Sequence, residues 1–251
     1  MTFADFIAAD FIAVDWTTFA LAFAVILVAA VVQGAAGLGF GVVAAPVMAI
    51  IDPVLVPGPL LVLALFLSLL VAWRERTAIR YGELAAALAG RIPASFLAGL
   101  TVGLLPTEHF LLVFSLMILA AVALSLSGWR LAATRGNLIA AGAVSGYMGT
   151  ITSVGAPPMG IIYQHVPGPH MRATMAAFFV VGAFISLVAL AAFDAFGWKD
   201  LLLSLKLVPA MVIGFAISGF MVRIVDKGYA RTAVLAVCTA SAGVLLVKAL
   251  W

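Results

Sequence analysis

Long apolar stretches that lack the alternation of a β-strand dominate this sequence. Leu60–Trp73 and Leu111–Leu126 contain no charged residue, and each approaches the length of about 20 residues that crosses a bilayer as a helix. Inside lipid every backbone polar group needs a partner within the protein, so only helices or closed barrels can span a membrane. A barrel requires apolar and polar residues to alternate. The sequence therefore predicts membrane-spanning α-helices.

Composition extends this prediction to the whole chain. Of 251 residues, 66% are hydrophobic and 9% are charged, whereas about a quarter of the residues in a soluble domain are charged. Such a chain has too little polar surface to face water on all sides. The net charge of +3 gives no indication of nucleic acid binding. We therefore predict an all-α integral membrane protein whose principal surroundings are the lipid bilayer.

Glycine and proline positions indicate an internal duplication of about eight hydrophobic segments. Gly34 and Gly146 are 112 residues apart, and the same shift places Pro46 on Pro158. The predicted division is an N-terminal segment at residues 1–16, a first membrane repeat at 17–129 and a second membrane repeat at 130–251.

Basic residues in the loops predict that the two repeats are inverted. Loops at 74–80 and 130–135 carry arginines and are expected in the cytoplasm. In the second half the basic loop, at 223–231, falls one span later, as an inverted repeat would require. Each glycine-rich block would then return to the side from which it came, as a broken or re-entrant helix pair. Eight simple spans in parallel repeats are the alternative.

Two glycine-rich segments, Gln33–Pro46 and Ser145–Pro158, are the strongest candidates for a binding site. Each glycine weakens a helix by about 1 kcal/mol relative to alanine, and broken backbone survives in a membrane only where protein or a water-filled cavity surrounds it. Broken helices at matching places in two halves indicate a transporter binding site. The alternatives are close helix packing for the glycines and hydroxyl bonds to a carbonyl one turn back for the threonines. The predicted substrate-binding residues in these segments are Gln33, Gly37, Gly39, Gly41, Ser145, Gly149, Thr150, Thr152, Ser153 and Gly155.

Two cations within predicted spans, Arg91 and Lys206, complete the predicted binding residues. Neither has an acidic residue nearby in the sequence. Charged side chains inside a membrane usually serve a function, and a cation that faces a cavity would attract an anion. The alternative is that each long side chain reaches back to the membrane surface.

The motifs resemble those of the sulfite exporter TauE/SafE family, also called the 4-toluene sulfonate uptake permease family. The resemblance rests on G-A-A-G-L-G-F-G before Pro46, on S-G-Y-M-G-T-I-T-S-V-G-A-P-P, and on Arg172-Ala173-Thr174. It implies a permease or exporter in the cell membrane, in bacteria the inner membrane, without a cofactor. The implied substrate is a small anion such as sulfite, a sulfonate or sulfoacetate, moved with a coupling ion. Ala35 and Ala36 replace residues that are more polar in many members, which leaves the substrate open.

Three other functional classes compete with a secondary transporter: an anion channel, an intramembrane enzyme and a purely structural membrane subunit. An anion channel would share the composition and the glycine-rich breaks. An intramembrane enzyme is disfavoured, because Ser145-Gly146 lacks the G-x-S-G spacing of a rhomboid-like site. We therefore predict a protein that is not an enzyme and that binds a small anion. An oligomer is compatible with the sequence.

Overall fold

The computed structural model describes residues 16–129, 131–164, 166–225, 239–241 and 243–247. Within these residues the chain is helical and contains no strand. The predicted N-terminal segment, apart from Trp16, lies outside the described residues, as do residues 226–231 of the predicted basic loop and most of the last hydrophobic segment. The helices are α2 (Trp16–Ala36), α3 (Phe40–Ile51), α4 (Gly58–Arg74), α5 (Tyr81–Leu104), α6 (Thr107–Leu126), α7 (Arg135–Thr152), α8 (Ala156–Tyr163), α9 (Gly168–Ala192) and α10 (Trp198–Val225), with short 3₁₀ turns η1 (Pro53–Leu55) and η2 (Arg76–Ala78).

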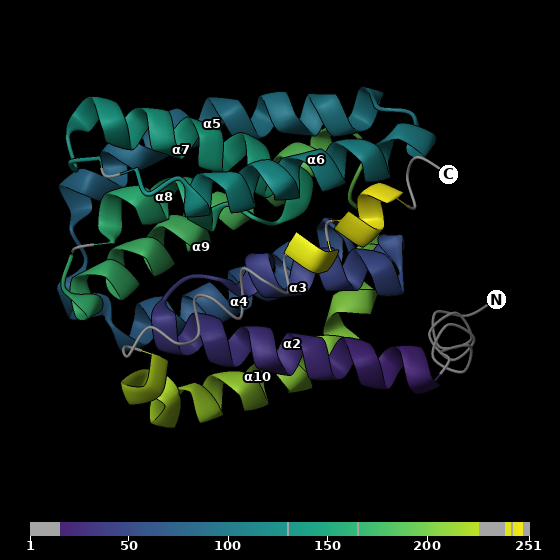
Figure 1. Ribbon diagram of the computed structural model, residues 1–251, viewed down its shortest axis with the longest axis horizontal. Coiled ribbons are helices and arrows are strands. Elements are labelled where there is room, and N and C mark those ends of the chain that lie inside the picture. Colours follow the sequence, from purple (N-terminus) through teal and green to yellow (C-terminus); the bar gives the residue numbers. More distant parts are fainter. Residues whose placement is uncertain (1–15, 130, 165, 226–238, 242, 248–251) are drawn as a thin grey trace.

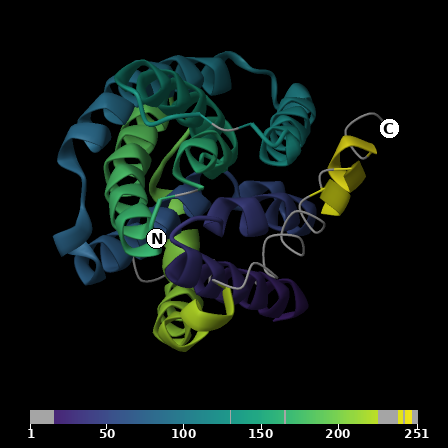
Figure 2. The same cartoon turned by 60° about the vertical axis from the view of Figure 1, so that its left-hand side comes forward.

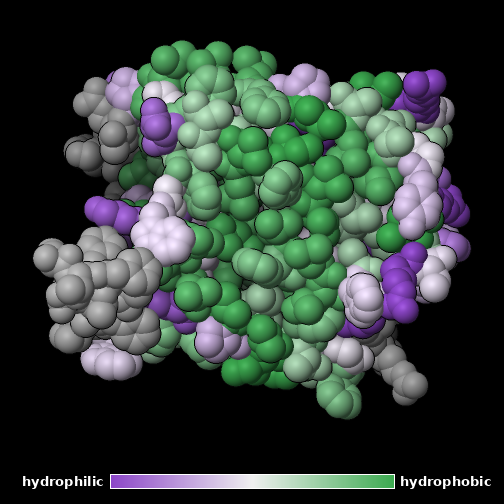
Figure 3. Space-filling view, turned by 180° about the vertical axis from the view of Figure 1, so that it is seen from behind, coloured by the Kyte–Doolittle hydropathy of each residue, from purple (hydrophilic) through white to green (hydrophobic). Residues whose placement is uncertain are grey.

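Six helical segments of the described chain are long and apolar enough to cross a membrane. They are Trp16–Ala36, Pro53–Arg74, Tyr81–Leu104, His109–Leu126, Gly168–Ala192 and Trp198–Met221. On the face seen in Figure 3, a broad apolar band lies between two ends that carry hydrophilic residues. The predicted class, an all-α multi-pass membrane protein, is thereby confirmed, whereas the count of about eight segments stays a prediction.

Both glycine-rich segments break a helix and reverse the chain. The first break separates α2 from α3 and contains Gly37 and Gly39, whose φ angles of 81° and 117° lie in the left-handed region that favours glycine. The second separates α7 from α8 and contains Ser153 at φ 62°. After each break the short helix turns back beside the helix that precedes it (Figure 1).

Equivalent helices of the two predicted halves run in opposite directions. The parallel neighbours are α5 and α7, α5 and α9, α2 and α10, and α4 and α10, while α4 and α9 run antiparallel. Consequently α2, α4 and α10 point one way and α7, α9 and α5 point the other. This is the geometry that an inverted repeat requires; the duplication itself stays a prediction.

The helix directions give the molecule a basic end and an acidic end. Several arginines gather where α4 and α10 end and where α5, α7 and α9 begin, and three of them, Arg74, Arg80 and Arg172, lie within ion-pair distance of Glu75 or Glu83. The opposite end carries Asp52, Asp194, Lys199 and Asp200. We use "basic end" and "acidic end" for these two ends below.

Two groups of helices meet along α4. In Figures 1 and 2, α5, α7, α8 and α9 form one group, whereas α2, α3 and α10 form another. Helix α4 packs against α9 of the first group and α10 of the second. Helices α5 and α7 approach each other closely at Gly142 and Gly146, because added β-carbons at these glycines would meet the backbone of α5. The two breaks face each other between the two groups of helices.

Candidate functional site

A small cavity lies between the two breaks, near the centre of the molecule. Residues 39–42 of the first break and residues 153–156 of the second line it, together with Gln33, Ser68 of α4, and Phe179 and Ala183 of α9. Its volume of about 30 Å³ is enough for at least one water molecule. The cavity is thus formed by both halves.

Gln33 fixes the geometry of the first break. This residue is 4% exposed, and its Oε1 accepts a hydrogen bond from the Phe40 N–H at 3.0 Å. The first N–H groups of a helix have no partner within the helix, so the glutamine caps α3 through its side chain. Its Nε2 donates to Ser68 Oγ at 3.3 Å. Sequence reasoning missed Ser68, because a lone hydroxyl in an apolar stretch carries no signal.

Side-chain hydroxyls hold the second break. Ser145 Oγ donates to the Gly155 carbonyl at 2.5 Å, and Ser153 Oγ donates to the Pro57 carbonyl at 3.2 Å. Thr152 Oγ1 donates to Met148 O at 2.7 Å and accepts from the Val154 N–H at 3.1 Å. The bonds to the Gly155 carbonyl and from the Val154 N–H satisfy backbone groups of the break itself.

Arg91 is buried in the interior beside the second break. It lies near the middle of α5 and is 2% exposed, so its side chain does not reach back to the membrane surface. Nη1 donates to Ser145 Oγ at 3.0 Å, and the guanidinium carbon lies 4.7 Å from the centre of the Phe178 ring. Within the described residues no carboxylate pairs with Arg91, and its Nε has no hydrogen-bond partner.

Three glycines make room for this guanidinium. An added β-carbon at Gly182 of α9 would overlap Arg91 Nε. β-Carbons at Gly149 and Gly155 would lie 3.5 Å and 3.3 Å from the two terminal nitrogens. Because Gly155 also lines the cavity, the cation lies directly behind the cavity wall. Sequence reasoning did not identify Gly182, which stands alone in an apolar stretch.

The predicted binding residues divide into three sets. Gln33, Gly39, Gly41, Ser153 and Gly155 line the cavity. Arg91, Ser145 and Gly149 form the buried cluster beside it. Gly37, Thr150, Thr152 and Lys206 lie outside the cavity lining.

The last set has other contacts. Gly37 packs against Arg172. Thr150 Oγ1 donates to the Gly146 carbonyl at 2.8 Å, as expected from the alternative interpretation of a bond one turn back. Thr152 bonds to Met148 O in the same way.

Helix packing places Lys206 away from Arg91. Lys206 is half-buried on α10, which packs against α2 and α4, whereas α5 packs against α7 and α9. Gly90 of α5 contacts Ile139 of α7, and Gly214 of α10 contacts Leu27 of α2. Because Leu27 and Ile139 are 112 residues apart, these two contacts are equivalent in the two halves. The residue that follows Gly214 is Phe215, which therefore takes the place that Arg91 has in the other half. Among the described residues, Arg91 therefore has no cationic counterpart at the matching position of α10.

Comparison with known proteins agrees with this architecture. A protein-family model described as "Sulfite exporter TauE/SafE" matches residues 22–245, which include both breaks and Arg91. Searches of curated proteins and of solved structures gave no match. Because the family match covers nearly the whole chain, the protein belongs to the sulfite exporter TauE/SafE family of membrane transporters.

Proposed function

We propose that this protein is a secondary transporter that binds a small anion between the two helix breaks. The observation that carries the proposal is the buried guanidinium of Arg91, which has no carboxylate partner in the described part of the chain. Burying an uncompensated charge is costly, and an anion in the adjoining cavity would offset that cost. The hydroxyl of Ser145 and the open backbone of the breaks supply neutral donors and acceptors beside the cation.

An oxyanion of sulfur is the first substrate to test. The family takes its name from sulfite export, and a guanidinium can donate two parallel hydrogen bonds to an oxyanion. Phe178 and Phe179 lie 4.7 Å and 5.9 Å from the guanidinium carbon, so an apolar wall stands beside the charge. Such a wall would also accept the organic part of a sulfonate.

The opposite directions of equivalent helices in the two halves favour alternating access over an open channel. The cavity lies between helices of both halves, which can move apart around it. In the proposed cycle they separate toward one end at a time, as in other transporters with inverted halves.

Uptake of radiolabelled sulfite and of a small sulfonate into proteoliposomes tests the proposal. We expect saturable flux in the parent and a fall of at least about tenfold in Arg91→Gln, because a lost charged partner in a desolvated site costs several kcal/mol. Arg76→Gln is the control, since Arg76 is exposed and stacks on Trp73 at 4.7 Å. Lys206→Gln should have a smaller effect than Arg91→Gln.

Three results would contradict the proposal in different ways. Normal flux in Arg91→Gln would exclude the cation as the binding group. Flux that does not saturate would indicate a channel. A parent protein that moves an amine and ignores both anions would overturn the substrate class.

A further inference from the structure

We propose that Arg172 and Glu75 form a latch that closes the central cavity toward the basic end and must open in each transport cycle. The inference rests on the proposed function, which makes the cavity a substrate site. It concerns residues that lie outside the cavity lining and that the transport proposal does not use.

The latch joins the two halves of the molecule directly. Arg172 lies near the start of α9, and Glu75 follows the last residue of α4. Arg172 Nε donates to Glu75 Oε1 at 3.2 Å. Because α4 and α9 run antiparallel past the cavity, this bond ties their neighbouring ends together at one end of the cavity.

Arg172 also covers the first helix break. Its residue exposure is 8%, and its side chain packs on Gly37, where an added β-carbon would lie 2.5 Å from Arg172 Cγ and 2.8 Å from its Cα. Gly37 has a φ of 81°. A larger residue at this position would therefore suffer backbone strain and would also displace the arginine. The arginine thus contacts α2 where the helix ends, on the side of the break toward the basic end.

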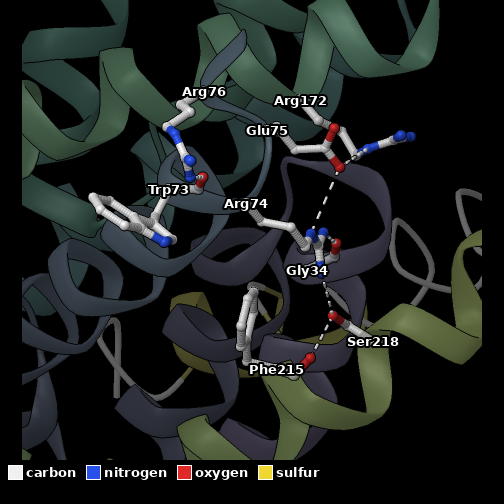
Figure 4. Close-up of polar contacts among 8 residues, drawn as sticks. All are labelled: Gly34, Trp73, Arg74, Glu75, Arg76, Arg172, Phe215 and Ser218. Carbon is white, nitrogen blue, oxygen red and sulfur yellow. Dashed lines mark hydrogen bonds and ion pairs between the residues drawn. The ribbon is translucent and has the colours of Figure 1, made fainter. Parts of the chain in front are cut away.

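Arg74 connects the same carboxylate to two more helices. Its Nε lies 3.6 Å from Glu75 Oε1, and its terminal nitrogens donate to the Gly34 carbonyl of α2 and to Ser218 Oγ of α10. The guanidinium also stacks over Phe215 at 5.0 Å. Figure 4 shows Glu75 between the two arginines, with Gly34 and Ser218 beyond Arg74. One carboxylate therefore links α2, α4, α9 and α10.

The position of the latch suits a contact that must open and close. The Glu75 side chain is 20% exposed and that of Arg172 is 9% exposed. Because Glu75 keeps part of its surface exposed, water can replace its bond to Arg172 when the two side chains separate. A fully buried pair would instead leave two unpaired charges in a low-dielectric interior. Substrate binding at the adjoining break could supply the free energy that opening needs.

Cysteine accessibility tests the latch without relying on transport. Ala64 lines the cavity from α4, so Ala64→Cys would report access to it, in a background where Cys238, the sole cysteine of the sequence, is replaced by serine. The probe is a membrane-impermeant maleimide, applied to sealed vesicles of each orientation. We expect Glu75→Gln and Arg172→Gln each to raise the labelling rate from the basic end by about tenfold, which corresponds to about 1.4 kcal/mol.

A double-mutant cycle separates the ion pair from general loosening. If the two residues act through their mutual bond, the double variant should label no faster than either single variant. Arg76→Gln, in the same loop, is the matched control and should label like the parent. Glu75→Gln retains the size of the side chain, so we expect the variant to fold. Size-exclusion chromatography would reveal a folding defect.

The outcomes distinguish the latch from the proposed function. Unchanged labelling in folded Glu75→Gln and Arg172→Gln would overturn the latch, even if the parent transports sulfite. Additive increases, or faster labelling from the acidic end, would overturn it as well. Failure of the parent to transport any anion would refute the proposed function, while the accessibility result would still report on the closure.

Discussion

Gly41 Cα lies against the carbonyl oxygen of Ser153, and a β-carbon on residue 41 would overlap that oxygen. The two residues are 112 residues apart and hold the same place in the two breaks. They therefore meet where a two-fold axis between inverted halves would pass. The contact explains why a glycine is needed at a position whose φ angle is not left-handed: the requirement is space.

Gly41→Ala should separate the two breaks. An added methyl group in a closely packed interior typically costs about 1–3 kcal/mol, and here it would meet backbone that cannot rotate away. We expect a lower melting temperature in detergent and little or no transport. Gly160→Ala, in α8, has open space around its added methyl group and should leave both measurements close to the parent. Equal melting temperatures for the two variants would show that the Gly41 contact is not tight.

Gly182→Ala should disable Arg91 without removing its charge. The added methyl group would occupy the place of Arg91 Nε, so the guanidinium would leave Ser145 and the cavity wall. We expect sulfite flux to fall about as far as in Arg91→Gln. The control is Gly219→Ala on α10, where nothing lies within 4 Å of the added carbon. Full activity in Gly182→Ala would mean that the position of Arg91 is not critical.

Ser145→Ala should weaken substrate binding more than it weakens the fold. The change removes the acceptor for Arg91 Nη1 and the donor to the Gly155 carbonyl. Each lost bond of this kind is worth about 1–3 kcal/mol, so we expect an increase in KM of about tenfold or more. Ser115→Ala is the matched control, because Ser115 is also fully buried but bonds to Leu111 O on α6. A KM change of the same size in both variants would contradict a specific role.

The basic end should face the cytoplasm, and both chain termini should lie outside. The reason is the excess of arginine at one end, since short loops rich in lysine and arginine remain in the cytoplasm. Single cysteines in place of Arg135 and Lys199, which lie at opposite ends, can be labelled with an impermeant maleimide in intact cells. We expect Lys199→Cys to label and Arg135→Cys to remain protected. A reporter fused after Trp251 that shows cytoplasmic activity would also contradict this topology.

The sequence alone determined the class of the protein and the location of its breaks. Uncharged stretches such as Leu60–Trp73 must be helical in lipid, because backbone groups there have no water to bind. Glycine and proline weaken helices wherever they occur, so Gln33–Pro46 and Ser145–Pro158 could be identified as broken. These are local properties, and they depend on residue type and spacing.

The tertiary structure decided which of these residues act together. The sequence pattern did not distinguish Arg91 from Lys206. Helix packing shows that Arg91 is buried among α5, α7 and α9, whereas Lys206 lies on α10. No sequence pattern identifies Ser68, Gly182 or the ion pair of Glu75. Their importance comes from partners that are far away in the sequence. A hydroxyl, a missing β-carbon or a carboxylate acquires its role from what packing places beside it, and spacing along the chain does not encode that.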